Sequence, residues 1–318
     1  GFSAIDTNYV EPQHYNWAFM IQNTYNYDVY RLSSAYGQEI LLSPDVLFRI
    51  GPYFGWRWIF LGTTIELKNL GVDNNSLKKE FTLSLYSAQI GVDLYYRRTG
   101  NDYKIRKANF GSDDVNDKLK SVPFDGLNVG ITGFNVYYIF NHNRFSYPAA
   151  FSQSTCQKIS CGSWMAGLGY THHNLELEHE KLKRVVEETT NNEVQIDSSL
   201  MFNRLKYDDI NVSVGYGYNW VFARNWLLGA SLSLALAYKW SSGDTNQPAD
   251  DFSFKNFNLD GVGRIGVVWN NTKWYFGSNV IMHSYNYRKS RFAANNVFGS
   301  LNIYCGFNFG IKKSYRKK

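Results

Sequence analysis

Two adjacent histidines, His172 and His173, carry the side chains best suited to acid–base chemistry in this chain. Either imidazole could activate a hydroxyl nucleophile, and Ser163 precedes them on the same predicted strand. These residues are weak catalytic candidates for a hydrolase, because nucleophile, base and orienting group must meet in one place. They match no catalytic pattern that we can identify. Ordinary polar side chains on a strand are the simpler interpretation.

A second set of residues could bind ions or one another. Five charged side chains fall on the polar faces of predicted strands: Arg57, Asp93, Arg97, Asp260 and Arg264. In the wall of a membrane barrel, a charge facing the acyl chains would cost roughly 2–4 kcal/mol near the midplane, so these residues should point inward. Two interpretations stay open. The charges either pair and stiffen a packed lumen, or line a narrow path for small solutes.

The elements that must position these residues are long alternating strands. From 296 to 311 apolar and polar residues alternate, with Val297, Leu301, Ile303, Cys305 and Phe307 on the apolar face. Period two sustained over this length indicates a strand with one apolar and one polar face. It is far longer than the usual strand of about five or six residues. Segments 211–222, 225–240 and 253–270 repeat the pattern, which predicts a transmembrane antiparallel β-barrel.

Aromatic residues support this prediction. They make up 17 % of the chain, and tyrosine and tryptophan favour membrane–water interfaces because each has an apolar body and a polar group. The ends of the apolar faces carry a predicted aromatic girdle: Trp220, Trp226, Tyr238, Trp240 and Trp269. No apolar run approaches the roughly 20 residues of a spanning helix.

We expect about twelve strands in one domain, residues 1–318. Their predicted ranges are 14–31, 38–50, 53–68, 80–98, 102–109, 126–140, 161–177, 206–220, 225–240, 253–270, 273–288 and 296–311. Alternation slips within 80–98, which predicts either a bulge there or a first half that protrudes beyond the bilayer. Short turns at 223–225 and 270–272 fit a periplasmic C-terminus. The chain starts at Gly1 without a charged and apolar leader, so we expect that a signal peptide has been removed.

Three segments fall outside the predicted wall. Residues 141–160 are a candidate periplasmic plug or partner segment, 178–205 a large charged extracellular loop, and 312–318 a basic tail. Cys156 and Cys161 are close enough in sequence to form a disulfide, which the spacing leaves open, whereas Cys305 should face lipid. We expect no metal site, because the cysteines lack further ligands at suitable spacing, and no cofactor.

The net charge of +6 is modest, and no nucleic-acid-binding motif accompanies it, so we expect no nucleic-acid partner. The expected surroundings are outer-membrane lipids and lipopolysaccharide, with envelope proteins as further partners.

Several stretches resemble one family: Asp6–Pro12, Gly51–Phe60, Leu83–Ser87, Gly91–Arg97 and Arg144–Gln153. The chain is similar to the DUF4421 family of Bacteroidota. The resemblance spans nearly the whole chain and implies an outer-membrane protein of unassigned function. It supplies no catalytic residues.

The sequence thus favours a non-enzymatic, integral outer-membrane barrel with a structural or accessory role in an envelope assembly or transport complex. A narrow solute pore, a lipid-active hydrolase and a soluble β-sandwich remain as alternatives.

Overall fold

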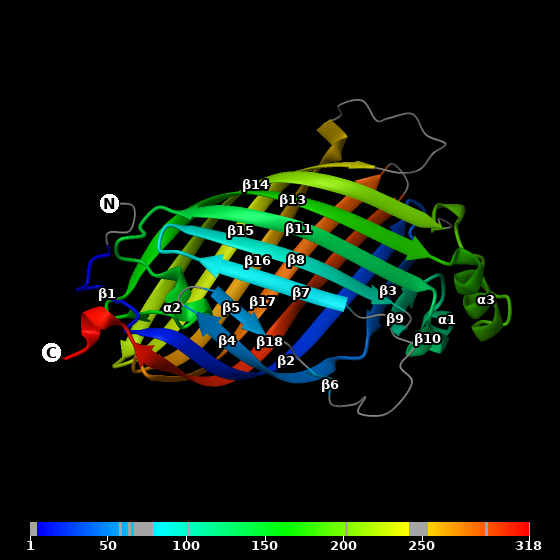
Figure 1. Cartoon of the computed structure of the whole chain (residues 1–318). Helices are drawn as coiled ribbons and strands as arrows, with labels where there is room; N and C mark the ends of the chain where they lie inside the picture. Colours follow the sequence, from blue (N-terminus) through cyan, green and yellow to red (C-terminus); the bar gives the residue numbers. More distant parts are fainter. Residues whose placement is uncertain are drawn as a thin grey trace.

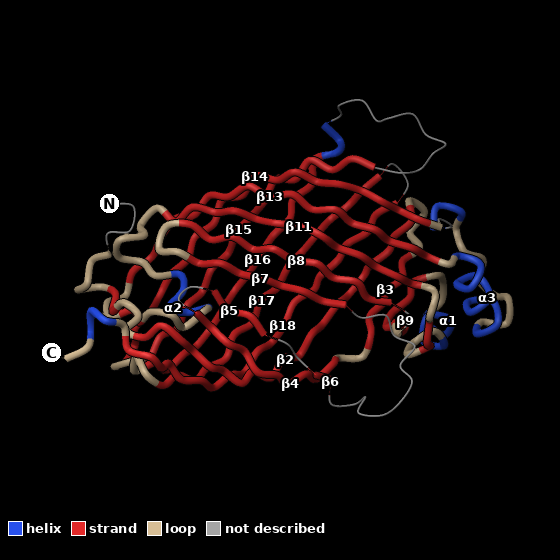
Figure 2. Tube along the Cα trace, viewed as in Figure 1, coloured by secondary structure: helices blue, strands red, loops and turns tan. Residues whose placement is uncertain are grey.

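The computed structural model describes residues 5–56, 59–62, 65–66, 79–100, 102–200, 203–241, 254–289 and 292–317. About two thirds of the described residues are in strands, and the main sheet curls round on itself (Figures 1 and 2). No helix among the described residues is long and apolar enough to cross a membrane.

The longest strands follow the alternating segments of the sequence. In chain order the strands are β1 (Val10–Glu11), β2 (Tyr15–Ser34), β3 (Glu39–Pro44), β4 (Leu47–Trp56), β5 (Ile59–Gly62), β6 (Ile65–Glu66), β7 (Lys79–Tyr86), β8 (Ile90–Gly100), β9 (Tyr103–Asn109), β10 (Val122–Phe124), β11 (Leu127–Ile139), β12 (Cys156–Gln157), β13 (Cys161–Leu177), β14 (Arg204–Ala223), β15 (Trp226–Ser241), β16 (Phe257–Asn270), β17 (Trp274–Lys289) and β18 (Phe292–Ile311). The helices are α1 (Asp113–Lys118), α2 (Tyr147–Phe151) and α3 (His179–Thr189), with short 3₁₀ turns at Ser198–Leu200, Phe254–Asn256 and Lys313–Tyr315.

Antiparallel pairing connects sequence neighbours from β13 to β18, and β18 pairs along its length with β2. On the other side, β13 pairs with β11, β11 with β8 and β8 with β7. Strand β7 meets β5 through one residue pair, β5 meets β4, and β4 pairs with β2. The pairings can therefore be followed from β2 through the sheet to β4 and back to β2.

The predicted alternation decides which way each side chain points. Val212 and Val214 of β14 and Leu232 and Leu234 of β15 occupy even-numbered positions, and each is half or more exposed on the outer surface. Intervening odd-numbered residues include buried polar side chains, such as Asn211 and Asn219. An apolar exterior and a polar interior reverse the usual order of a soluble protein. Cys305 lies on the exposed outer face, as predicted.

The first half of the chain departs from the predicted strand ranges. The expected strand 38–50 is two strands, because β2 is long enough to pair with β4 through Trp17–Asn26 and with β3 through Tyr30–Ser33. The prediction of a bulge within 80–98 was wrong. The chain reverses there, and the Ser87 amide donates to the Ile90 carbonyl 2.9 Å away, so β7 and β8 form a hairpin.

The predicted strand 102–109 exists as β9, but β9 pairs with β3 and β10. It is therefore not part of the circuit of pairings, by which we mean the series that leads from β2 through the sheet to β4 and back to β2. The predicted strand 53–68 overlaps β4, β5 and β6, with 57–58, 63–64 and 67–68 outside the described residues. The count of about twelve wall strands stays a prediction.

Helices α1 and α3 lie at the end of the sheet opposite the termini (Figure 1), where buried apolar side chains form a hydrophobic core. Leu182 and Val186 of α3 are buried there against strand ends that include Leu127 and Leu177. The charged 178–205 segment is thus folded over much of its length, because its apolar residues repeat at helical spacing in 179–189 and bury one face of α3.

Removing that apolar face should loosen the segment without unfolding the wall. Leu182→Ala should weaken its packing by about 2–5 kcal/mol, as expected for a buried leucine, and expose α3 to trypsin at Lys183. Limited proteolysis followed by mass spectrometry would measure this change. The exposed Glu188→Ala serves as control. Equal cleavage of both variants would contradict the packing described here.

Candidate functional site

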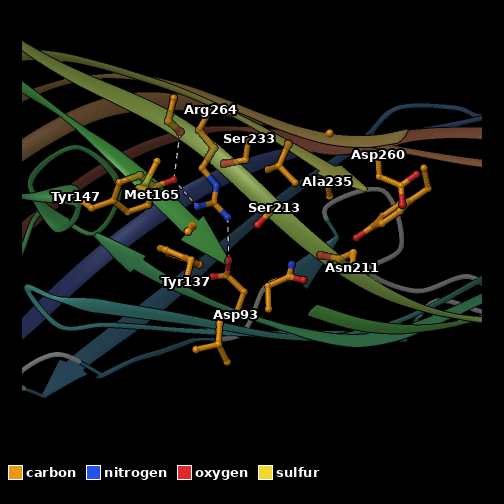
Figure 3. A pocket seen from close by; sticks show the side chains of 17 residues that line it. Asp93, Tyr137, Tyr147, Met165, Asn211, Ser213, Ser233, Ala235, Asp260 and Arg264 are labelled. Carbon is orange, nitrogen blue, oxygen red and sulfur yellow. Dashed lines mark hydrogen bonds and ion pairs between the residues drawn. The ribbon is translucent and has the colours of Figure 1, made fainter. Parts of the chain in front are cut away.

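The centre of the interior is crossed by an ion pair. Arg264 of β16 reaches over to Asp93 of β8, with 2.9 Å between guanidinium nitrogen and carboxylate oxygen (Figure 3). The same guanidinium donates to the hydroxyl of Tyr147 at 2.5 Å. Strands β8 and β16 are not sheet neighbours, since β11, β13, β14 and β15 separate them along the sheet. The pair therefore ties two distant parts of the wall to each other.

Two further buried pairs lie in the interior. Lys239 bonds to Asp260 at 2.9 Å, and its side chain is fully buried. Its ammonium also lies 5.9 Å from the ring centre of Tyr207 and 5.7 Å from that of Tyr285. This cation is thus held by a carboxylate and two aromatic faces.

The third pair joins Arg97 to Asp28 at 3.5 Å. Asp28 also accepts hydrogen bonds from the Tyr103 hydroxyl at 2.7 Å and from the Asn296 amide at 2.8 Å. A buried carboxylate needs such donors, because its desolvation is costly when it is left without them.

The interior thus receives four of the five predicted lumen charges, namely Asp93, Arg97, Asp260 and Arg264. Arg57 lies outside the described residues. The sequence-based pairing missed Asp28 and Lys239, which complete two of the three pairs. Both lie on the inward faces of long alternating strands, and that position could have identified them.

Residues 141–160 fold into the mouth of the sheet at the end that holds both termini (Figure 1). Phe145, Tyr147, Ala149 and Ala150 are all buried. The wall residue Asn219 donates to the Ser146 carbonyl at 2.8 Å and to the Gln157 side chain at 3.1 Å. These contacts anchor the segment to β14, and Tyr147 connects it to the central ion pair.

Small residues on the inner wall make room for this segment. A Cβ atom on Gly229 would lie 2.6 Å from the Cβ of Ala150, and one on Gly217 would lie 3.0 Å from the Phe145 ring. A side chain at Gly229 would therefore force the segment to move, because real Cβ atoms do not approach this closely. Gly263, which lies between the exposed Leu259 and Ile265 on the outward face of β16, has nothing within 4 Å of the same position.

A cavity of about 60 Å³ remains between the segment and the charge pairs (Figure 3). Asp93, Tyr147, Ser231, Asp260 and Arg264 are among the side chains that line it. This volume holds a few water molecules, given that one water needs roughly 10–15 Å³ by the same measure. It is too small for an organic solute of ordinary size.

The three catalytic candidates do not come together. His172 faces outward, with Nδ1 2.7 Å from an Asp208 oxygen that also accepts from the Tyr170 hydroxyl. His173 faces inward, 3.4 Å from Asp209. Ser163 is nine residues along the same strand, about 30 Å away at the usual rise per residue.

Ser163 instead donates to the Trp164 carbonyl at 2.8 Å and accepts from the Asn141 amide at 2.9 Å. Neither histidine can reach it.

The predicted girdle residues lie on the outer face at two levels. Trp226 and Trp269 are direct cross-strand partners near the end that holds the termini. Trp220 also lies at that end, half exposed, opposite Leu228. Tyr238 and Trp240 lie at the other end of β15, with ring centres 6.2 Å apart.

None of the three cysteines forms a disulfide. Cys156 donates to the Asn270 carbonyl at 3.6 Å, and burial raises the pKa of its thiol to about 12. Cys161 donates to the Arg144 carbonyl at 3.2 Å. Within the described ranges, no group of three or more histidine, cysteine, aspartate or glutamate side chains is arranged to hold a metal ion.

A family model described as "Domain of unknown function (DUF4421)" matches residues 4–309. A search of curated protein sequences finds no match. Three of the similar solved structures are bacterial. The outer membrane protease OmpT from Escherichia coli is 8 % identical, with 92 % of this chain and 97 % of that chain covered and a TM-score of 0.38. The COG4313 outer membrane channel from Pseudomonas putida F1 is 8 % identical, with 97 % of this chain and 98 % of that chain covered and a TM-score of 0.33. The toluene transporter TodX from P. putida is 8 % identical, with 93 % of this chain and 91 % of that chain covered and a TM-score of 0.28. Identity and TM-score are low in all three.

The central pair provides a test of the interior. Arg264→Met should destabilise the protein by about 3–5 kcal/mol, because it removes the guanidinium that pairs with the buried Asp93 carboxylate. Asp93→Asn/Arg264→Met should recover much of that loss. Guanidinium unfolding in detergent, followed by tryptophan fluorescence, gives both values. Arg204→Met, which breaks an exposed pair with Glu176, should change little. Equal effects of Arg264→Met and Arg204→Met would contradict a structural role of the central pair.

Proposed function

We propose that this chain, which belongs to the DUF4421 family, is an integral outer-membrane β-barrel with a filled lumen. Its proposed role is structural or accessory, in an envelope assembly or transport complex. The observation that carries the proposal is the occupied interior. One mouth holds residues 141–160, the centre holds charge pairs, and the far end holds a hydrophobic core.

The outward side chains support the membrane assignment. Leu168, Val212, Leu232, Leu236 and Leu259 are each more than half exposed. A continuous apolar exterior of this kind is unfavourable in water and favourable against acyl chains, so outer-membrane lipids and lipopolysaccharide are its proposed surroundings. The two levels of outward tyrosine and tryptophan side chains fit two membrane interfaces.

The circuit of pairings supports a wall of twelve strands: β2, β4, β5, β7, β8, β11, β13, β14, β15, β16, β17 and β18. An even number is usual for bacterial single-chain barrels. Twelve strands fall between eight, whose side chains fill the interior, and sixteen, which leave a channel. In this chain the extra width is taken up by the 141–160 segment. The end that holds both termini is the proposed periplasmic end, because three of its connections, 87–89, 224–225 and 271–273, are short turns.

A narrow pore is the second candidate, and the polar cavity beside Asp93 and Arg264 favours it. The cavity would become part of a solute path only if the 141–160 segment moved. Separation of Ser163 from both histidines removes the geometric support for a hydrolase.

The filled lumen predicts that the purified protein is electrically silent in planar lipid bilayers. The seals at the mouth, centre and far end lie in series, so thermal motion of one of them should not open a path. Single-channel recording measures this directly, with heat-dependent gel mobility as the test of folding. Steady, resolvable conductance of folded protein would favour the pore instead.

The mouth segment can be tested separately by chemical labelling. In a background without native cysteines, Ser231→Cys places a thiol beside Tyr147, whose hydroxyl lies 3.2 Å from the native Ser231 oxygen. A membrane-impermeant maleimide should label it slowly. Adding Gly229→Val, which displaces Ala150, should accelerate labelling, whereas Gly263→Ala should not. Fast labelling without Gly229→Val would contradict the plugged mouth.

A further inference from the structure

The two ends of the barrel differ in charge. The end that holds both termini comprises residues 5–14, 87–89, 140–160, 224–225, 271–273 and 312–317, and we call it the basic end. It carries two acidic side chains, Asp6 and Glu11. Its eight basic side chains are Arg144, Lys158, Arg224, Lys273, Lys312, Lys313, Arg316 and Lys317. The surplus of six positive charges is absent from the helices of the other end, where α1 and α3 together carry six acidic and four basic residues.

Hydrogen bonds join the turns that carry Arg224 and Lys273 into one arc at the basic end. Asn270 donates from its backbone to the Asn225 carbonyl at 2.9 Å, which joins the turn holding Arg224 to the turn holding Lys273. The Asn308 amide then donates to the Lys273 carbonyl at 2.7 Å, which joins that turn to the strand leading into 312–317. Arg224 and Lys273 are exposed, and no carboxylate among the described residues pairs with either of them.

A pocket of about 370 Å³ opens beside this arc. Its apolar side is formed by Ala149 of the plug and by Leu227 and Val268 of the wall, while Arg224 and Lys158 lie at its polar side. The volume lies within the usual range for a ligand pocket, roughly 300–1,000 Å³. A cavity with both apolar and cationic walls therefore adjoins Arg224 and Lys273.

Glu11 also lines the pocket, but its charge is already compensated. Its carboxylate lies 2.7 Å from Lys158 and 2.5 Å from His14. Burial acts to raise the pKa of Glu11, and the hydrogen bonds from Lys158 and His14 outweigh it, so the pKa is lowered. The pocket's remaining cation is Arg224.

We infer that the basic end is a docking surface for an acidic segment of a periplasmic protein, with apolar side chains of that segment in the pocket and its carboxylates on Arg224 and Lys273. The inference rests on the proposed function, since it names the chemistry of the partner that an accessory barrel would bind. Electrostatic complementarity of this kind selects the partner and accelerates its approach.

A lipid headgroup fits this position less well. Leu227, Val268 and Asn270 lie on the inward faces of their strands, so the pocket is within the ring of turns. Lipids contact the outer circumference, at the level of Trp220 and Trp226, and an anchored headgroup would have to leave that level to enter. A peptide segment approaching from the aqueous side has no such restriction.

The test uses full-length protein in a neutral detergent and three fluorescent ten-residue peptides: alternating Glu-Leu, Glu-Ser and Lys-Leu. Fluorescence anisotropy should show binding of Glu-Leu, weaker binding of Glu-Ser and none of Lys-Leu. Arg224→Glu/Lys273→Glu should weaken Glu-Leu binding about tenfold at low ionic strength, and added salt should reduce the difference. Lys181→Glu/Lys183→Glu, the same charge reversal at the far end, should leave binding unchanged.

Equal affinity for Glu-Leu and Lys-Leu, or an unchanged affinity after the Arg224 and Lys273 reversal, would overturn the inference. So would binding of soluble dihexanoyl-phosphatidylglycerol that depends on Arg224 and Lys273 while the peptides fail to bind, because the surface would then recognise headgroups. The conductance experiment stands apart from this one. A conducting barrel that binds Glu-Leu would refute the filled lumen alone, and a silent barrel that does not bind would refute the docking surface alone.

Discussion

The alternation of side chains along extended strands is the constraint on which this structure depends. Successive residues must point to opposite faces, so a wall with an apolar exterior sends every second residue into a confined interior. In this chain many of those residues are polar, and polar groups buried there need partners. The interior consequently pairs Arg264 with Asp93, Lys239 with Asp260 and Arg97 with Asp28, each at 3.5 Å or less. The charge pairs follow from the same period-two pattern that forms the wall.

Much of the wall could be predicted because period two is local information. The strands from β13 to β18 lie close to the ranges expected from the sequence, since each carries its own uninterrupted alternation. The first half could not be read in this way. Ser87–Gln89 contains neither glycine nor proline, so a reversal there looks like a slipped register rather than a turn. Strand β9 alternates like a wall strand, and only its partners β3 and β10 show that it stands outside the circuit.

The interior shows a second limit of sequence reasoning. Alternation indicated that Asp93 and Arg264 face inward, but not that they meet, because their strands are far apart in both sequence and sheet order. The position of Tyr147 was equally hidden. Its segment, 141–160, has no periodic pattern, and its place depends on shape: Gly229 lies where Ala150 needs space, and Gly217 lies where Phe145 does. Such complementarity is a property of two surfaces and is absent from either sequence segment alone.

The same segment links the interior to the basic end. Tyr147 contacts Arg264 in the lumen, while Lys158, eleven residues later, lies at the pocket beside Arg224. Ala149 is buried in the plug and also forms part of that pocket's wall. A ligand that packed against Ala149 would therefore press on the segment that occupies this end of the interior. Under the proposed docking, a partner bound at the basic end would hold the segment against Gly229, so binding of the partner and filling of the proposed lumen would depend on one structural unit.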